Sequence, residues 1–217
     1  KDYEKAVILK PDYAEAYYNL GITFRELGQL EAALKSYEKA LAIKHEYPEA
    51  HNNLGSVLLD LGSLDSATDH FEWALAFKPN YPEAHNNLGV VARKLEKLDK
   101  AIKSFNKAID IQPNYVQAHS NLGNILQDIG QLDAAMDCYK NALAINPNHT
   151  QCYLDIGLIH KEKGQIDDAI KFFEKALTIN PNHAVTYDNL SDIKKYTIDQ
   201  KHITKMQSLL SSDTLSP

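Results

Sequence analysis

The sequence predicts an all-α protein, an α-solenoid of antiparallel helix pairs, on three observations. The segment YPEAHNNLG stands at residues 47–55 and again, 34 positions later, at residues 81–89. Within that period, apolar residues recur at i+3 and i+4 spacings in two successive runs, as they do in amphipathic helices. A glycine usually separates the two runs, and a proline usually follows the second. A period of this length indicates stacked units of one helix pair each.

The period can be followed along most of the chain. A leucine or isoleucine followed by a glycine or serine recurs at residues 20–21, 54–55, 88–89, 122–123, 156–157 and 190–191. Two alanine columns flank an aromatic column at residues 37, 71, 105, 139 and 173. Full repeats are therefore expected at residues 14–47, 48–81, 82–115, 116–149 and 150–183.

Both ends of the chain are expected to depart from the full repeat. Residues 1–13 fit the second helix of a truncated repeat, so we expect the chain to have been cut from a longer protein. Residues 184–217 begin a partial repeat and then lose the pattern. There we expect a capping helix, in which Ile203, Met206 and Leu210 share one face, followed by a frayed tail.

The helices have predictable ends and a predictable contact. In the second repeat the apolar runs extend from Ala50 to Leu61 and from Leu64 to Phe77. Glycines are expected to end the first helices in left-handed caps at residues 28, 62, 130 and 164. Glu96 takes this place in the third repeat and predicts a less well capped turn. We expect a first-helix glycine to face an alanine of the second helix, with the aromatic side chain beside them.

Composition excludes several classes of function. The 217 residues are 44% hydrophobic and carry a net charge of -6, with lysines spread along the chain, so no nucleic-acid partner is expected. No apolar run is long enough to predict a membrane span. Cys138 and Cys152 lack zinc or disulfide-framework spacing, which favours reduced thiols and a cytoplasmic location.

The recurring Leu-Gly, the alanine and aromatic columns and the closing Pro-Asn resemble the tetratricopeptide repeat. The resemblance implies a right-handed superhelix whose first helices line a concave groove. It also implies a scaffold that binds extended peptides or partner proteins. The segment LSDIKKYTIDQKHITKMQSLL further resembles the segment that closes such arrays in bacterial proteins that continue into a sulfotransferase-type or glycosyltransferase-type domain.

A column of amides is the main candidate binding site. The residue before each recurring leucine or isoleucine is Asn19, Asn53, Asn87, Asn121, Asp155 or Asn189. Asparagine offers one acceptor and two donors, which suits it to pair with an extended main chain. The column resembles the asparagine ladder in the repeat superhelix of O-GlcNAc transferase, from which Asp155 departs by favouring a donor or a cation. Asn52 and Asn86 neighbour the ladder and are further candidates. In the alternative interpretation, these amides satisfy backbone groups between adjacent first helices.

Neither a metal site nor catalysis is expected. His51, His85 and His119 recur at the repeat period where other repeats have tyrosine, which is typical of a half-buried packing position. Successive copies are expected to lie too far apart to share an ion. No acid, base and nucleophile converge by any recognisable spacing, so we predict no enzymatic activity and no cofactor.

Trp73 differs in type from the equivalent residues of the other repeats. Residues 39, 107, 141 and 175 are lysine or asparagine, which predicts an outward face of the second helix. An exposed tryptophan favours a contact surface and raises the hypothesis of a homo-oligomer. The alternative is that the ring simply lies along its own helix.

Two functions are consistent with these observations. The first is a non-catalytic scaffold that binds a protein or an extended peptide in the concave groove. The second is the substrate-recruiting arm of a larger sulfotransferase or glycosyltransferase whose catalytic domain lies outside this sequence.

Overall fold

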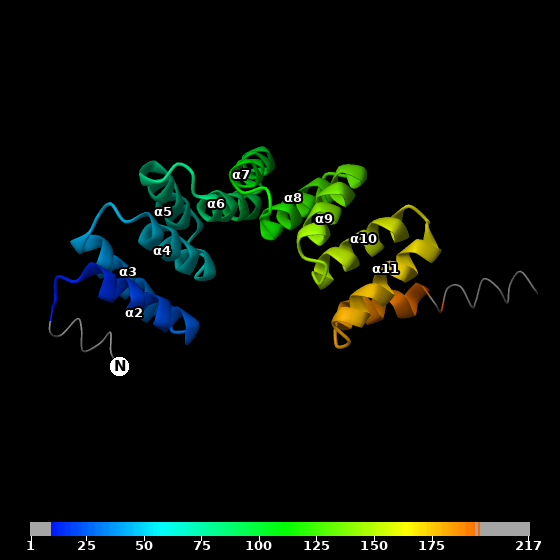
Figure 1. Ribbon diagram of the computed structural model, residues 1–217, viewed down its shortest axis with the longest axis horizontal. Coiled ribbons are helices and arrows are strands. Elements are labelled where there is room, and N and C mark those ends of the chain that lie inside the picture. The colour runs from blue at the N-terminus through cyan, green and yellow to red at the C-terminus, as the bar shows by residue number, and fades with distance from the viewer. Residues whose placement is uncertain (1–9, 194, 196–217) are drawn as a thin grey trace, which may run out of the picture. The chain divides into compact units, whose positions relative to one another are not determined.

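The computed structural model describes residues 10–193 and 195. The helices in this part of the chain are α2 (Ala14–Glu26), α3 (Leu30–Ile43), α4 (Pro48–Asp60), α5 (Leu64–Phe77), α6 (Pro82–Lys94), α7 (Leu98–Ile111), α8 (Val116–Asp128), α9 (Leu132–Ile145), α10 (Thr150–Glu162) and α11 (Ile166–Ile179) (Figure 1). Residues 184–193 are also helical, and no strand occurs among the described residues. The chain is an all-α solenoid, as predicted.

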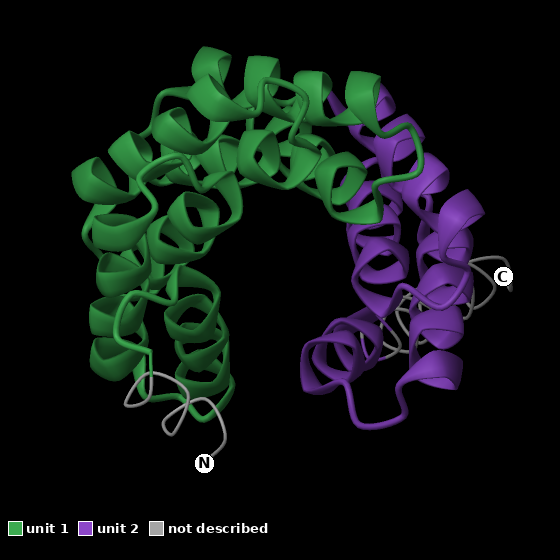
Figure 2. Cartoon of the chain, turned by 60° about the vertical axis from the view of Figure 1, so that its left-hand side comes forward, with its two compact units in different colours: residues 1–130 green, residues 131–217 purple. Residues whose placement is uncertain are grey.

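The chain forms two compact units, residues 1–130 and residues 131–217 (Figure 2). Unit 1 contains α2 to α8, and unit 2 contains α9, α10, α11 and the helical residues 184–193. The division falls between α8 and α9. Most of the helix predicted over residues 1–13, and all of the capping helix and tail predicted after residue 195, lie outside the described residues. The handedness of the superhelix stays a prediction.

Unit 1 is built of two layers of helices. The first helices of successive pairs contact one another, α2 with α4, α4 with α6 and α6 with α8. Each second helix, α3, α5 or α7, packs between its own first helix and the next one. The second helices approach one another less closely than the first helices do. Successive pairs in unit 1 therefore converge on the first-helix side, which is the concave side of this unit.

Left-handed glycines end the first helices as predicted. The φ angles of Gly28, Gly62, Gly130 and Gly164 lie between 71° and 79°. At Gly62, the glycine N–H donates to the carbonyl of Leu59 at 3.1 Å, and the N–H of Ser63 donates to the carbonyl of Leu58 at 2.8 Å. These bonds satisfy carbonyls at the end of α4 that would otherwise lack partners.

The turn after α6 closes in the same way although its residue is Glu96. The Glu96 N–H donates to the carbonyl of Arg93, and the Lys97 N–H donates to that of Ala92, both at 2.9 Å. The turn after α6 therefore makes the same capping hydrogen bonds as the turn at Gly62, and the expectation that it is less well capped is wrong in this respect. The departure from glycine takes the form of backbone strain, because Glu96 has a φ of 57°, a region that disfavours side chains with a Cβ.

We expect Glu96→Gly to raise the free energy of unfolding of unit 1 by about 1 kcal/mol, because glycine adopts this conformation without the steric penalty. Urea denaturation followed by circular dichroism measures the change. Glu72→Gly is the matched control. Glu72 is exposed in the middle of α5 and forms an exposed ion pair with Lys100, so glycine there should destabilise the protein by about 1 kcal/mol through helix propensity, with a small further loss from the ion pair. Loss of stability in both variants would refute the strain at residue 96.

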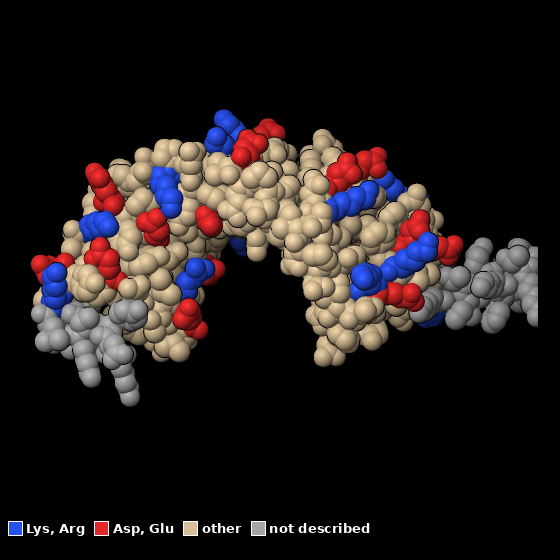
Figure 3. Space-filling view, viewed as in Figure 1, with Lys and Arg blue, Asp and Glu red and all other residues tan. Residues whose placement is uncertain are grey.

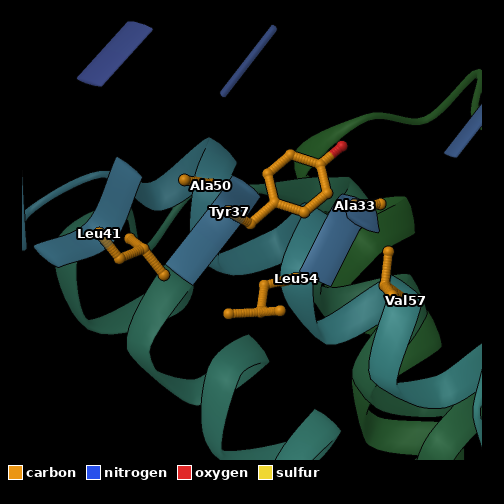
Figure 4. Packing of buried hydrophobic residues seen from close by; sticks show 6 residues of the cluster. All are labelled: Ala33, Tyr37, Leu41, Ala50, Leu54 and Val57. Atoms are coloured by element: carbon orange, nitrogen blue, oxygen red, sulfur yellow. The ribbon is translucent and has the colours of Figure 1, made fainter. Parts of the chain in front are cut away.

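The contact between paired helices differs from the one predicted. A Cβ built on Gly55 would lie 2.8 Å from the Phe71 ring, and one on Gly89 would lie 2.6 Å from the Phe105 ring. The glycine therefore faces the aromatic ring of its partner helix, and the predicted glycine–alanine contact is wrong. The second-helix alanine belongs to the same core as the ring: Figure 4 shows Ala33 in a cluster with Tyr37, Leu54 and Val57.

Tyr37 is the one tyrosine in this aromatic column of unit 1. Its side chain is fully buried, and its hydroxyl makes no hydrogen bond of normal geometry, although the Asn53 side chain lies close enough to lower its pKa slightly. Burial raises its pKa to about 12, so the hydroxyl stays neutral. The equivalent positions in other repeats hold phenylalanine at residues 71, 105 and 173.

We expect Tyr37→Phe to stabilise unit 1 by about 1 kcal/mol, because the substitution removes a buried polar group that makes no hydrogen bond of normal geometry. Tyr18→Phe is the control. The Tyr18 hydroxyl accepts a hydrogen bond from Asn53, so its removal should destabilise the protein. Equilibrium unfolding in urea compares the two. A destabilised Tyr37→Phe variant would mean that the hydroxyl has a partner in solution.

Candidate functional site

The ladder asparagines of unit 1 lie near the middle of the first helices. Asn19 is on α2, Asn53 on α4, Asn87 on α6 and Asn121 on α8. All four are partly exposed. Because α2, α4, α6 and α8 form the concave side of unit 1, the four amides follow that side from one helix to the next.

Hydrogen bonds connect the amides between successive first helices. The Nδ2 atom of Asn87 donates to Asn52 Oδ1 at 3.0 Å, and that of Asn121 donates to Asn86 Oδ1 at 2.9 Å. At the equivalent place one repeat earlier, Asn53 Nδ2 donates to the Tyr18 hydroxyl at 3.1 Å. Asn53, Asn87 and Asn121 thus each reach back 35 positions to the neighbouring helix.

Longer hydrogen bonds join neighbouring amides within a helix. Asn52 Nδ2 donates to Asn53 Oδ1 at 3.5 Å, and Asn86 Nδ2 donates to Asn87 Oδ1 at 3.4 Å. Asn52 and Asn86 are each only 6% exposed. Together these contacts form an amide network that runs from Tyr18 to Asn121. The sequence predicted Asn52 and Asn86 only as neighbours of the ladder, and their role in linking it was missed. The sequence feature that could have indicated this role is a column of polar residues at positions 18, 52, 86 and 120.

The network agrees in part with the alternative interpretation, because the amides do serve neighbouring first helices. Their partners are side chains, however, and each bond fixes the orientation of an amide that remains partly exposed. Asn53 and Asn121 each donate one of two amide hydrogens to the network. The Oδ1 atoms of Asn53 and Asn87 accept only weak, long bonds. Donors and acceptors therefore stay available on the concave side of unit 1.

Charged side chains beside the ladder are paired across successive helices. Arg25 of α2 contacts Asp60 of α4 at 3.3 Å, and Arg93 of α6 contacts Asp128 of α8 at 2.7 Å. Figure 3 shows that charges of both signs are interspersed on one face of the molecule, without an extended patch of one sign. Beside the ladder, Arg25 and Arg93 are each offset by the carboxylate that they contact.

A hollow of about 390 Å³ lies next to the ladder in unit 1. It is lined by Ile22, Arg25 and Glu26 of α2 together with Tyr37 and Asn53. The apolar part of the hollow and the amide of Asn53 could accept a side chain beside a bound main chain.

The two ladder residues of unit 2 have different surroundings. Asp155 on α10 is 7% exposed and accepts a hydrogen bond from Gln151 on Oδ1 at 2.8 Å, whereas its Oδ2 atom has no partner. Burial raises the pKa of Asp155 to about 6. Asn189 accepts a hydrogen bond from Lys161 at 3.1 Å and donates to the carbonyl of Val185 at 2.9 Å. Asp155 and Asn189 therefore do not continue the side-chain pattern of unit 1.

The histidine positions bring together a pair that the repeat pattern did not predict. His51 on α4 and His70 on α5 have their Nδ1 atoms 3.0 Å apart, within hydrogen-bonding distance. Within the described residues no group of three or more His, Cys, Asp or Glu side chains could hold a metal ion. In the same part of the chain, no helix is both long and apolar enough to cross a membrane.

Trp73 on α5 is 47% exposed and lies in a ring cluster. Its ring stacks on Phe77 with centroids 5.9 Å apart and on His51 at 6.3 Å, and the His45 ring meets it edge-on at 5.5 Å. The ring therefore packs along its own helix, against α4 of the same pair and against His45 in the loop before α4, and it still exposes nearly half of its surface.

Comparisons with known proteins agree with this architecture. A crystal structure of MamA is 27% identical to this chain, covers 76% of it and 96% of its own chain, and superimposes with a TM-score of 0.67. The structure of YrrB, described as a TPR protein with an unusual peptide-binding site, is 25% identical and covers 87% of this chain and 97% of its own, with a TM-score of 0.65. TTC0263, a thermophilic TPR protein of Thermus thermophilus, shares the fold at 23% identity, covering 83% of this chain and 98% of its own, with a TM-score of 0.68. None of the curated proteins compared matches the sequence.

Family models cover most of the sequence. Models of the tetratricopeptide repeat match residues 2–35, 82–115 and 114–182, and a TPR repeat model matches residues 23–62 and 55–95. Together the matches extend over residues 2–182, which include the helices from α2 to α11. The chain therefore belongs to the tetratricopeptide repeat family.

Proposed function

We propose that this protein is a non-catalytic scaffold that binds an extended polypeptide along the first helices of unit 1. In this proposal Asn53, Asn87 and Asn121 hydrogen-bond to the main chain of the bound segment, with Asn19 at the end of the same column. The observation that supports it most is the amide network, which orients a row of partly exposed amides from α4 to α8.

The network lowers the entropic penalty of binding. An isolated surface asparagine must lose rotamer freedom when a ligand binds, whereas an amide already held by a neighbour loses less. Asn52 and Asn86 act as positioning residues, because they are buried and hold the ladder amides through Oδ1 and Nδ2. In unit 2 the same column is represented by Asp155 and Asn189, which would contribute a separate set of contacts.

The charges predict how the ligand is recognised. Because Arg25 and Arg93 are already paired with carboxylates, the groove offers mainly neutral hydrogen-bonding groups. The affinity for the peptide should therefore depend weakly on salt concentration. Recognition should rest on the main chain of the peptide more than on its charged side chains. The peptide-binding site for which YrrB is described is consistent with this class of ligand. In the alternative function, as the substrate-recruiting arm of a larger transferase, the chain would bind the polypeptide substrate in the same groove.

Selection of peptides from a random displayed library, followed by affinity measurements with the selected peptide, tests the proposal. The double variant Asn53→Ala and Asn87→Ala should bind the peptide on the order of tenfold or more weakly, since each lost hydrogen bond contributes about 1 kcal/mol. The control is the pair Asn106→Ala and Asn141→Ala, which removes two exposed amides from second helices. An equal loss of affinity in the two double variants would rule out the ladder as the binding site. Unchanged affinity of the Asn53→Ala and Asn87→Ala variant would rule it out as well.

A further inference from the structure

Unit 1 has two equivalent grooves between its second helices, away from the amide network. The first lies between α3 and α5 over α4, measures about 490 Å³ and includes Leu41 and Trp73 in its lining. The second lies between α5 and α7 over α6, measures about 960 Å³ and includes Leu75 and Ile102. Their linings correspond at a spacing of 34 residues, as Leu41 and Leu75 do. We call them the tryptophan groove and the lysine groove.

The two grooves differ in their aromatic rings because of three substitutions. In the tryptophan groove His70 and Trp73, with Phe77 beside them, occupy the space with aromatic rings. The residues 34 positions later are Ser104, Lys107 and Ile111. The lysine groove therefore keeps an apolar floor that includes Leu75 and Leu88 but has no aromatic ring other than that of His85. One groove thus presents a half-exposed indole, and the other has room for one.

The charged residues of the two grooves differ. Glu38 and Asp69 are the charged residues in the lining of the tryptophan groove. Burial lowers the pKa of His51 to about 4 and also lowers that of His70, so neither offsets these carboxylates at neutral pH.

The lysine groove carries charges of both signs, including two lysines that form no ion pair with any residue that the structure describes. Lys100, Lys103 and Lys107 line it together with Asp99 and Asp110. Lys100 is paired with Glu72 of α5 at 3.0 Å. Lys103 and Lys107 have no ion-pair partner among the described residues and are exposed, so they can meet acidic groups on another molecule.

We propose that two copies of this chain associate face to face through the second-helix side of unit 1, with Trp73 of each copy inserted into the lysine groove of the other. Both grooves lie on the same side of unit 1 and share α5, so a twofold axis near α5 places each tryptophan over the opposite lysine groove. A buried tryptophan is a frequent energetic centre of interfaces. The same pairing brings Glu38 and Asp69 close to Lys103 and Lys107.

Sedimentation equilibrium of the full chain over a range of concentrations tests the proposal with two independent variants. The wild type should be in a monomer–dimer equilibrium. Trp73→Lys should raise the dimer dissociation constant on the order of tenfold or more. Lys103→Glu combined with Lys107→Glu should do the same, because it places carboxylates opposite Glu38 and Asp69. Circular dichroism verifies that both variants keep their helix content. Leu61→Lys is the control, because Leu61 is also exposed, at 39%, and does not line either groove.

Mixing the two variants distinguishes this arrangement from a general loss of association. Each variant alone lacks both contacts of the symmetric dimer. A mixture restores one complete contact, because the lysine groove of the Trp73→Lys chain can receive the tryptophan of the other chain. A heterodimer in the mixture supports the proposal. A wild type that stays monomeric, a Trp73→Lys variant that still forms dimers as the wild type does, or a mixture without heterodimers would each overturn it.

Discussion

Replacing Gly89 with alanine is expected to lower the free energy of unfolding of unit 1 by about 2 kcal/mol, as overpacked cores generally lose roughly 1 to 3 kcal/mol. The new Cβ would lie 2.6 Å from the nearest Phe105 ring carbon, which is well inside van der Waals contact. The Phe105 side chain is fully buried, so it cannot move aside without displacing its neighbours. In an unhindered helix the same substitution stabilises by about 1 kcal/mol, so the sign of the change reports on the contact.

A double-mutant cycle tests this explanation. Phe105→Leu makes room for the Cβ, so the combined Gly89→Ala and Phe105→Leu variant should lose less stability than the sum of the single variants. Urea denaturation of the four proteins gives the coupling free energy. A stabilised Gly89→Ala variant, or additive effects in the cycle, would contradict the close contact between glycine and ring.

The second large effect is expected at Asp155 in unit 2. Asp155→Asn should raise stability on the order of 2 kcal/mol at pH 7, because the buried carboxylate is ionised there while one oxygen lacks a partner. Burial raises the folded-state pKa to about 6, above the ordinary value of 3.8. The folded protein therefore binds the proton more tightly than the unfolded chain does. Ionisation of Asp155 destabilises the fold above about pH 6, and this penalty disappears as the pH falls toward 4.

The advantage of the asparagine variant should follow the same pH dependence. It should be full at pH 7, decrease as the pH falls through 6 and be nearly absent at pH 4. Hydrogen exchange of amides in α10 and α11 measures the local stability of unit 2 without requiring two-state unfolding of the whole chain. Asp188→Asn, which changes an exposed carboxylate in the same unit, serves as the control. An equal gain in stability of the Asp155→Asn variant at pH 7 and at pH 4 would show that ionisation of Asp155 is not the cause.

The helices could be predicted from the sequence because their signals are local. The apolar runs from Ala50 to Leu61 and from Leu64 to Phe77 correspond to α4 and α5, and Gly62 between them has the left-handed φ that glycine favours. Glu96 shows the limit of this reasoning. Its residue type predicted a weaker cap, whereas the flanking helices hold the turn closed despite the strain at that residue.

Contacts between helices were harder to predict, because they depend on the angle at which each helix presents a residue. Gly55 was expected to face an alanine and instead faces Phe71. The amide column was predicted, but the bond from Asn87 to Asn52 was not, since it joins residues that are 35 rather than 34 positions apart. The extra residue reflects the offset between adjacent first helices, which a repeat alignment alone does not contain.

The central claim is that the amides of the first helices in unit 1 hydrogen-bond to the main chain of a bound polypeptide. The side-chain NH₂ resonances of asparagine, followed by NMR while the library-selected peptide is added, test it most directly. We predict that the resonances of Asn53, Asn87 and Asn121 shift on binding, while that of Asn106 on the second helix α7 stays in place. Unchanged ladder resonances at saturating peptide, or shifts confined to second-helix residues such as Asn106, would contradict the account.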